Sequence, residues 1–164
     1  MNTEVNWDAA TFFETLVSTN KLAKREGFGF YLVAGMEDFA EAVANLQSQR
    51  AFVALDDVSE GYIELRNNTP ITRRVKSVYL AMRHRVDDMS ARAECLETMR
   101  ELFRQFMTVL NLERTQLQER HINLLSNIRF TEVDKYAFSG CAVCMFQLTT
   151  EINTDLRYND DEWE

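Results

Sequence analysis

Apolar side chains recur at helical spacing near the start of the chain. The stripe consists of Ala9, Phe12, Phe13, Leu16 and Val17. Because residues three and four apart share one face of a helix, the stripe predicts a helix that Asn6 caps and that Gly27 and Gly29 end. Its last part carries cations, which suit the negative end of a helix dipole, at Lys21, Lys24 and Arg25.

A short strand and a second helix are expected next. Residues Phe28 to Val33 are apolar and partly aromatic, which favours a strand. Between Met36 and Gln49 the apolar side chains of Phe39, Val43 and Leu46 return to helical spacing. This spacing predicts the second helix.

Two further strands are predicted to form a hairpin. Residues Ala51 to Leu55 have the pattern of a strand, and Asp56 to Gly61 supply the polar and flexible residues of a turn. A return strand begins at Tyr62, Ile63 and Leu65. Pairing of these two neighbours is the simplest arrangement of the segment.

A long strand is expected from Arg73 to Arg85, after a loop at Arg66 to Pro70 that holds the only proline. Its middle is apolar on both faces, with Val78, Leu80 and Met82 on one and Tyr79 and Ala81 on the other. A strand that is apolar on both faces is covered on both, so we expect it at the centre of the sheet.

The longest helix should begin at Asp88 or Ser90, either of which can cap it. Its apolar stripe extends over about six turns and consists of Met89, Ala93, Leu96, Met99, Phe103, Phe106, Met107 and Leu110. The opposite, solvated face carries Arg92, Glu97, Arg100, Glu101 and Arg104.

Two strands close the predicted domain as a hairpin. In the first, Ile122, Leu124, Ile128 and Phe130 alternate with polar residues, although its start also fits a helix. The second begins at Gly140 and directs one set of side chains to one face: Ala142, Cys144, Phe146, Leu148 and Ile152.

These elements predict an α+β fold, in which a mostly antiparallel sheet is packed by a long amphipathic helix and two shorter helices. No linker or repeat divides residues 1–154, which we interpret as a single domain. Residues 155–164 hold five acids against one arginine and are expected to form a flexible acidic tail.

The composition of the chain limits which kinds of partner and which cellular compartment are expected. Of the 164 residues, 46% are hydrophobic, which is enough for a core without metals or disulfides. The net charge of −8 argues against specific nucleic-acid binding, because phosphate contact needs clustered cations. The chain has three cysteines, no basic flank of a signal peptide and no apolar stretch of membrane-spanning length. We therefore expect synthesis in the cytoplasm, reduced thiols and no membrane contact.

No catalytic, cofactor or metal site is predicted. Cys141 and Cys144 have the spacing of a redox pair or half a zinc site, but residues three apart in a strand point to opposite faces. His84 and His121 lie in no motif that supplies a nucleophile or an orienting carboxylate. Structural roles are the preferred interpretation for all four residues.

The charged residues around the first predicted hairpin are candidates for a subunit interface. Asp56, Asp57 and Glu60 lie in the turn, and Arg73 and Arg74 begin the long strand. Acids of one copy can face arginines of a neighbour. The alternative is an ordinary solvated turn and a strand end that is kept soluble by charge.

The order of elements, with FVALDD leading into the hairpin, RRVKSVYLAMRH as the long strand and CAVCMFQLTTEI as the last strand, resembles tail terminator and tail-completion (head-tail joining) proteins of tailed phages and prophages. The resemblance covers Trp7 to Ile152 and is topological. It implies a small α+β subunit without an active site that assembles into a ring, commonly a hexamer, and contacts other tail or neck proteins in the virion.

A net acidic subunit suits a ring through which DNA passes without binding. Two other classes remain open from the sequence. A cytosolic ligand-binding or protein-binding module would share the same composition and would be recognised by an apolar pocket and a monomeric or dimeric state. An enzyme with a site built from dispersed residues would need perturbed titratable groups in a cleft, and it ranks third.

Overall fold

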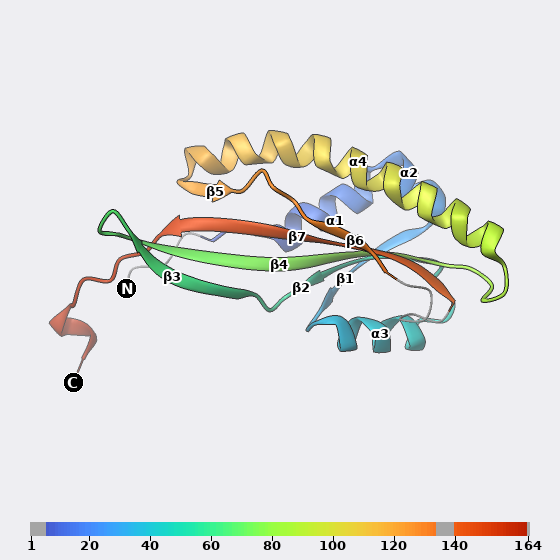
Figure 1. Cartoon of the computed structure of the whole chain (residues 1–164), viewed down its shortest axis with the longest axis horizontal. Coiled ribbons are helices and arrows are strands. Elements are labelled where there is room, and N and C mark those ends of the chain that lie inside the picture. The colour runs from blue at the N-terminus through green and yellow to red at the C-terminus, as the bar shows by residue number, and fades with distance from the viewer. Residues whose placement is uncertain (1–5, 134–139, 164) are drawn as a thin grey trace.

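The computed structural model describes residues 6–133 and 140–163 (Figure 1). In chain order the elements are α1 (Ala9–Thr19), α2 (Lys21–Glu26), β1 (Phe28–Val33), α3 (Met36–Asn45), β2 (Ala51–Asp56), β3 (Glu60–Arg66), β4 (Thr69–Arg83), α4 (Met89–Glu119), β5 (Ile122–Leu124), β6 (Phe130–Glu132), β7 (Cys141–Asn153) and a 3-10 turn, η1 (Asp160–Glu162). The predicted α+β class is confirmed.

All seven strands of the described residues belong to one sheet. The main order is β1-β2-β4-β7-β5, while β3 pairs with β4 and β6 pairs with β7. Only β1 and β2 run parallel; the other pairs are antiparallel. The prediction of a mostly antiparallel sheet with the long strand at its centre is therefore confirmed.

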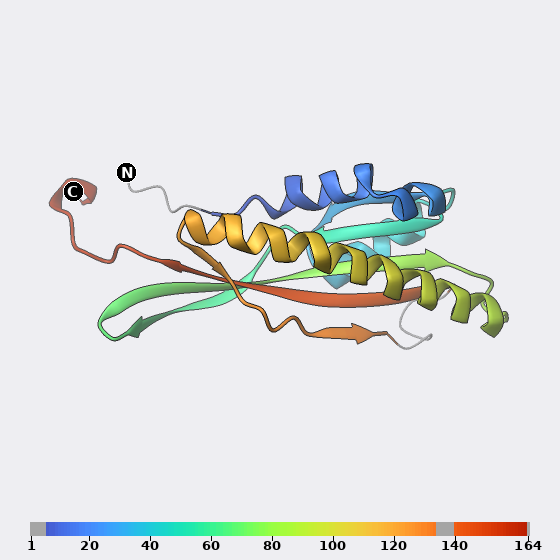
Figure 2. The same ribbon diagram turned by 90° about the horizontal axis from the view of Figure 1, so that it is seen from above.

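Helices cover the two faces of the sheet unequally. Figure 1 shows α1, α2 and α4 above the sheet and α3 below one half of it, and Figure 2 shows α1 and α4 lying side by side along the strands. The upper core receives Val78, Leu80 and Met82 from β4, and the lower core receives Tyr79 and Ala81. The predicted alternation of β4 is thus confirmed.

The first predicted helix is two helices. Asp8, not Asn6, caps α1 by accepting a hydrogen bond from the backbone N–H of Thr11, and Asn20 interrupts the chain with an extended ψ of 126°. The Asn20 side chain accepts from Ala23 N–H and begins α2. Asparagine competes for backbone hydrogen bonds in this way, so Asn20, just beyond the apolar stripe, ends one helix and begins the next.

The predicted pairing of β2 with β3 is wrong. β2 instead pairs with β1 and β4, while β3 turns back along β4. The segment expected as a loop is a tight turn at Asn67 and Asn68, whose φ angles are 51° and 65°. Two left-handed residues form the turn that matches strand twist, and asparagine tolerates this conformation. β4 consequently starts at Thr69, earlier than predicted.

The long helix starts after its predicted cap, Asp88, but its N-terminal face is rotated from the predicted stripe. Met89 is 55% exposed and Ala93 is exposed, whereas Arg92 is buried. The Arg92 guanidinium donates to the carbonyl oxygens of Cys141 and Val133 at 3.3 and 2.9 Å. Hydropathy spacing cannot anticipate a buried cation of this kind, because the two acceptors lie 49 and 41 residues further along the chain.

The strand predicted over Ile122 to Phe130 is two short strands, β5 and β6, which both pair with β7. Between them the backbone of Leu125 donates to Thr149 O and the carbonyl of Arg129 accepts from Gln147 N–H. Phe130 is 59% exposed and does not belong to the buried face. The antiparallel pairing of β6 with the last strand agrees with the predicted hairpin.

Candidate functional site

The predicted interface residues lie on two faces of the sheet. Asp57 and Arg74 line one hollow of about 330 Å³, on the same face as α1. Asp56 and Glu60 line a second hollow, of about 390 Å³, beside α3. Arg73 contacts neither hollow and instead binds Glu151 within its own chain. Of the five predicted interface residues, only Asp57 and Arg74 therefore line the same hollow.

Asp56 is a buried carboxylate. It accepts hydrogen bonds from the Tyr79 hydroxyl at 3.3 Å and from Gly35 N–H at 3.2 Å. Burial raises the pKa of Asp56 above its ordinary value, against the lowering effect of these bonds. Burial and the neighbouring Asp56 charge also raise the pKa of Tyr79 to about 12. Through these two hydrogen bonds inside the chain, Asp56 holds the end of β2 in place.

The hairpin of β3 and β4 is held by a close backbone approach. A Cβ atom at Gly61 would collide with the carbonyl oxygen of Arg73, so only glycine lets β3 lie this near to β4. The tight turn at Asn67 and Asn68 closes the far end. The hairpin extends the sheet beyond the half that α3 covers (Figure 1).

An ion cluster around Glu151 ties the hairpin to β7. The buried Glu151 carboxylate accepts hydrogen bonds from Arg73, from Arg66 at 3.2 Å and from Asn123 at 3.4 Å. The Arg73 guanidinium also lies 5.3 Å from the ring centre of Tyr62. Burial opposes ionisation of Glu151, but the two arginines outweigh it and lower its pKa.

Three large apolar side chains of β3 are exposed, and we call them the hairpin surface. Tyr62 is 48% exposed, Ile63 55% and Leu65 69%. Ile63 and Leu65 share one face of the strand and Tyr62 lies on the other. Within the described part of the chain β3 pairs with β4 alone, so its second edge carries backbone groups available for pairing.

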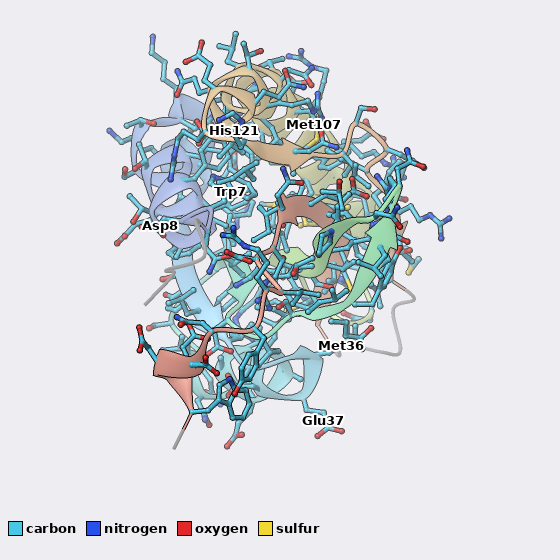
Figure 3. The ribbon with its side chains drawn as sticks, turned by 90° about the vertical axis from the view of Figure 1, so that its left-hand side faces the viewer. Trp7, Asp8, Met36, Glu37, Met107 and His121 are labelled. Carbon is cyan, nitrogen blue, oxygen red and sulfur yellow. The ribbon has the colours of Figure 1, made fainter. Side chains whose placement is uncertain are left out.

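The hollow of 330 Å³ lies next to this hairpin. Its walls come from the start of α1 and the residues before it, from the β2-β3 turn, from β4 and from β7, and they combine apolar and polar groups with two cations: Asn6, Trp7, Ala9, Asp57, Ser59, Arg74, Lys76, Leu148 and Thr150. Figure 3 shows the structure from this end, with Trp7 on the inner side of α1 and Asp8 on its outer side. Trp7 Nε1 donates to Glu113 at 3.2 Å, and the ring packs against Phe12 and Phe13.

The cysteines do not form a dithiol. All three are buried and free, and Cys141 belongs to the lower core whereas Cys144 belongs to the upper one. The expectation of opposite faces is confirmed. Burial raises the pKa of Cys141, and it raises the pKa of Cys144 to about 11, which keeps both as unreactive thiols at neutral pH.

In the described residues, no hydrogen bond joins either histidine side chain to a nucleophile. His84 Nδ1 lies 2.7 Å from the carbonyl oxygen of Arg85, and His121 sits at a turn with a φ of 61°. Across residues 6–133 and 140–163 no three His, Cys, Asp or Glu side chains gather as a metal site requires. No described helix is long and apolar enough to cross a membrane.

Glu151 was not among the predicted site residues, and the prediction that Arg92 lies on the solvated face of α4 is wrong, because Arg92 is buried. Glu151 alternates with the apolar residues of β7, and one available signal was a lone acid in a strand opposite the arginine-rich start of β4. For Arg92 the spacing gave no signal. No protein-family model matches this chain, and no curated protein is significantly similar to it.

Proposed function

We propose that the protein is a non-enzymatic assembly subunit that forms a ring in the tail of a phage or prophage, as a tail terminator or tail-completion protein. The observation that carries the proposal is the hairpin surface, three exposed apolar side chains on a strand with an open edge. The choice of a phage-tail ring, rather than another kind of assembly, rests on the resemblance in the order of elements.

A strand of this kind favours contact with another chain. Exposed Ile63 and Leu65 leave apolar area in water, and burial of such area contributes about 25 cal/mol per Å². The unpaired backbone groups of β3 add hydrogen bonds when a partner covers the edge. A second copy that covers the hairpin surface satisfies both requirements at once.

Charge is consistent with a ring around DNA. The chain has a formal net charge of −8. A ring of such subunits presents a negative lumen that repels phosphates and lets DNA pass without adhesion. The ion cluster at Glu151 keeps two arginines of the hairpin occupied by an internal partner, so that they do not form a phosphate site.

Light scattering coupled to size exclusion tests the proposal. The ring predicts a mass that rises with concentration to a closed species of about six chains. A mass of one chain at every concentration, up to the millimolar range, would contradict self-assembly. If the closed species forms, negative-stain images of it should show rings.

A second candidate function is a ligand-binding module, and the hollow beside Trp7 is the observation that favours it. A volume of about 330 Å³ is within the range of small-molecule sites, and Arg74 and Lys76 add cations to its wall. This candidate predicts a monomer whose Trp7 fluorescence changes saturably with a small anionic ligand. A concentration-dependent ring mass instead favours the assembly subunit.

A further inference from the structure

The last described residues form a small folded element, which we call the C-terminal knob (residues 155–163). The Arg157 guanidinium donates to the Asp155 carboxylate at 2.6 Å, and the Asn159 side chain accepts from Asp161 N–H at 3.2 Å. The rings of Tyr158 and Trp163 stack with centres 6.3 Å apart. The knob therefore has local order of its own.

The apolar side chains of the knob are uncovered. Trp163 is 68% exposed, Tyr158 73% and Leu156 54%. Within the described residues, the hydrogen bonds, ion pairs and ring contacts of residues 156–163 all stay inside the knob. Figures 1 and 2 show this segment standing clear of the sheet. Two stacked aromatic rings held in water mark a contact site for another surface.

The hollow beside Trp7 is complementary to the knob in size and in charge. A cavity of about 330 Å³ admits an aromatic side chain, and its wall contains Trp7 and Leu148. Among the described residues of its wall, Lys76 and Arg74 are cations and Asp57 is an acid. The knob carries four acids and one arginine. The Lys76 ammonium donates hydrogen bonds to the backbone carbonyl oxygens of Asp57 and Asp56, at 3.4 and 3.5 Å.

We propose that the knob of one copy docks into the hollow of a second copy, with its aromatic rings against Trp7 and its acids near Lys76. The inference rests on the proposed function and adds a second contact between neighbouring subunits, besides the hairpin surface. The knob and the hollow are different surfaces, so the contact is heterologous and generates a ring or a filament.

The path of the chain favours a second copy over the same one. Thr154 N–H donates to Pro70 O at 3.0 Å, which fixes the chain at the hairpin end of β4. The hollow uses Thr150 and Leu148, earlier on β7. To reach its own hollow the knob must reverse direction immediately after Thr154 and give up the turn between Asp155 and Arg157.

Two variants of the full chain break opposite halves of the contact. Tyr158→Ser with Trp163→Ser removes the knob aromatics and leaves the hollow intact. Lys76→Glu reverses the charge of the hollow and leaves the knob intact. Each is expected to raise the concentration at which the chain assembles at least tenfold, because buried aromatic contacts dominate interface energies. Matched controls are Leu112→Ser and Lys24→Glu, exposed residues of α4 and α2 whose substitution should change nothing.

Mixing the two variants identifies the geometry. At a concentration where each is a monomer, an equal mixture should contain a two-chain species and nothing larger, because only one intact knob meets one intact hollow. If the wild type assembles and both variants assemble equally well, or if mixing restores nothing, the knob contact is overturned and the ring remains. If the wild-type chain never assembles, both the knob contact and the proposed ring are overturned. Circular dichroism confirms the fold of each variant.

Discussion

The two halves of strand β4 show what covers a sheet and what leaves it open. From Val78 to Met82 the side chains are fully buried, because the upper helices pack on one face and α3 packs on the other. From Thr69 to Lys76 only Thr72 is buried. One strand therefore contributes both to the core and to an accessible surface, and the difference arises from the helices rather than from the strand.

The open half is held together by polar contacts. Glu151 binds Arg66 and Arg73 across three strands, and Tyr62 lies beside the Arg73 guanidinium. Such a cluster fixes the hairpin by polar contacts on the face of Tyr62. Ile63 and Leu65 lie on the opposite face, where they remain exposed. In the covered half, the rings of Phe39 and Tyr79 stack 4.9 Å apart instead.

The largest expected effect lies in the covered half. Phe146 is fully buried, and its ring contacts Phe13 and Phe103 with centres 6.1 and 5.0 Å apart. Phe146→Ala should lower the free energy of unfolding by about 3–5 kcal/mol in urea denaturation. Phe130, its partner across β6 and β7, is 59% exposed, and Phe130→Ala should cost under about 1 kcal/mol. Equal losses would refute the assigned burial.

The buried arginine of α4 gives the next largest effect. Arg92→Ala leaves the carbonyl oxygens of Cys141 and Val133 without their donor and should reduce the free energy of unfolding by about 2–3 kcal/mol. Arg104 lies on the same helix, pairs with Glu101 and is 63% exposed. Arg104→Ala should have almost no effect in the same denaturation assay. If Arg92→Ala lowers the free energy of unfolding by only a small amount, the hydrogen bonds of Arg92 contribute little to stability.

Two carboxylates should respond to pH in opposite directions. The pKa of Glu151 is lowered by Arg66 and Arg73, so its contribution is present above about pH 4.5 and is lost as the pH falls through the lowered value. Glu151→Gln should therefore reduce stability by about 1–2 kcal/mol at pH 7 and have little effect near pH 2.

Asp56 is the opposite case. Its raised pKa means that the folded state prefers the protonated acid, a preference fully present below pH 3.8 and lost as the pH rises through the raised value. Asp56→Asn should stabilise the fold slightly at pH 7, by under about 1 kcal/mol, and not at pH 3. Urea midpoints at the two pH values measure both variants, and shifts of the same sign would contradict the assignment.

The smallest effect on stability belongs to the hairpin surface. Ile63→Asp with Leu65→Asp should change the free energy of unfolding of the monomer by only about 0.5 kcal/mol, because more than half of each residue is already exposed. The same double variant should abolish the assembled species in light scattering. Leu112→Asp, at a side chain of α4 that is 69% exposed, serves as the control and should assemble normally. Assembly by the double variant would remove the hairpin surface from the interface.

Periodicity predicted most of the elements but not their pairing. The strand at Phe28 to Val33 has the predicted bounds, because local composition determines whether a short apolar segment is extended. The pairing of β3 depends on Gly61 and on the turn at Asn67 and Asn68. The sequence shows these residues, but not the strand that they bring together. The segment from Arg66 to Pro70 was predicted as a loop, but its centre is a two-residue turn at Asn67 and Asn68.

The candidate site was less predictable than the fold. Asp57 and Arg74 were singled out by charge and do line one hollow, whereas Arg73 is occupied by Glu151. The exposure of Ile63 and Leu65 has no signature in the sequence, because a strand with apolar residues is ordinarily buried on at least one face. Only the three-dimensional arrangement shows that no described helix reaches that end of β3.

Amide hydrogen exchange of the wild-type chain at low and high concentration tests the central claim most directly, since it reports on backbone groups of β3 without any substitution. The account predicts that exchange in residues 60–66 slows as the chain assembles, while exchange in the exposed helix α2 stays constant. Assembly with unchanged exchange in residues 60–66 would contradict the assignment of the hairpin surface as the contact between subunits.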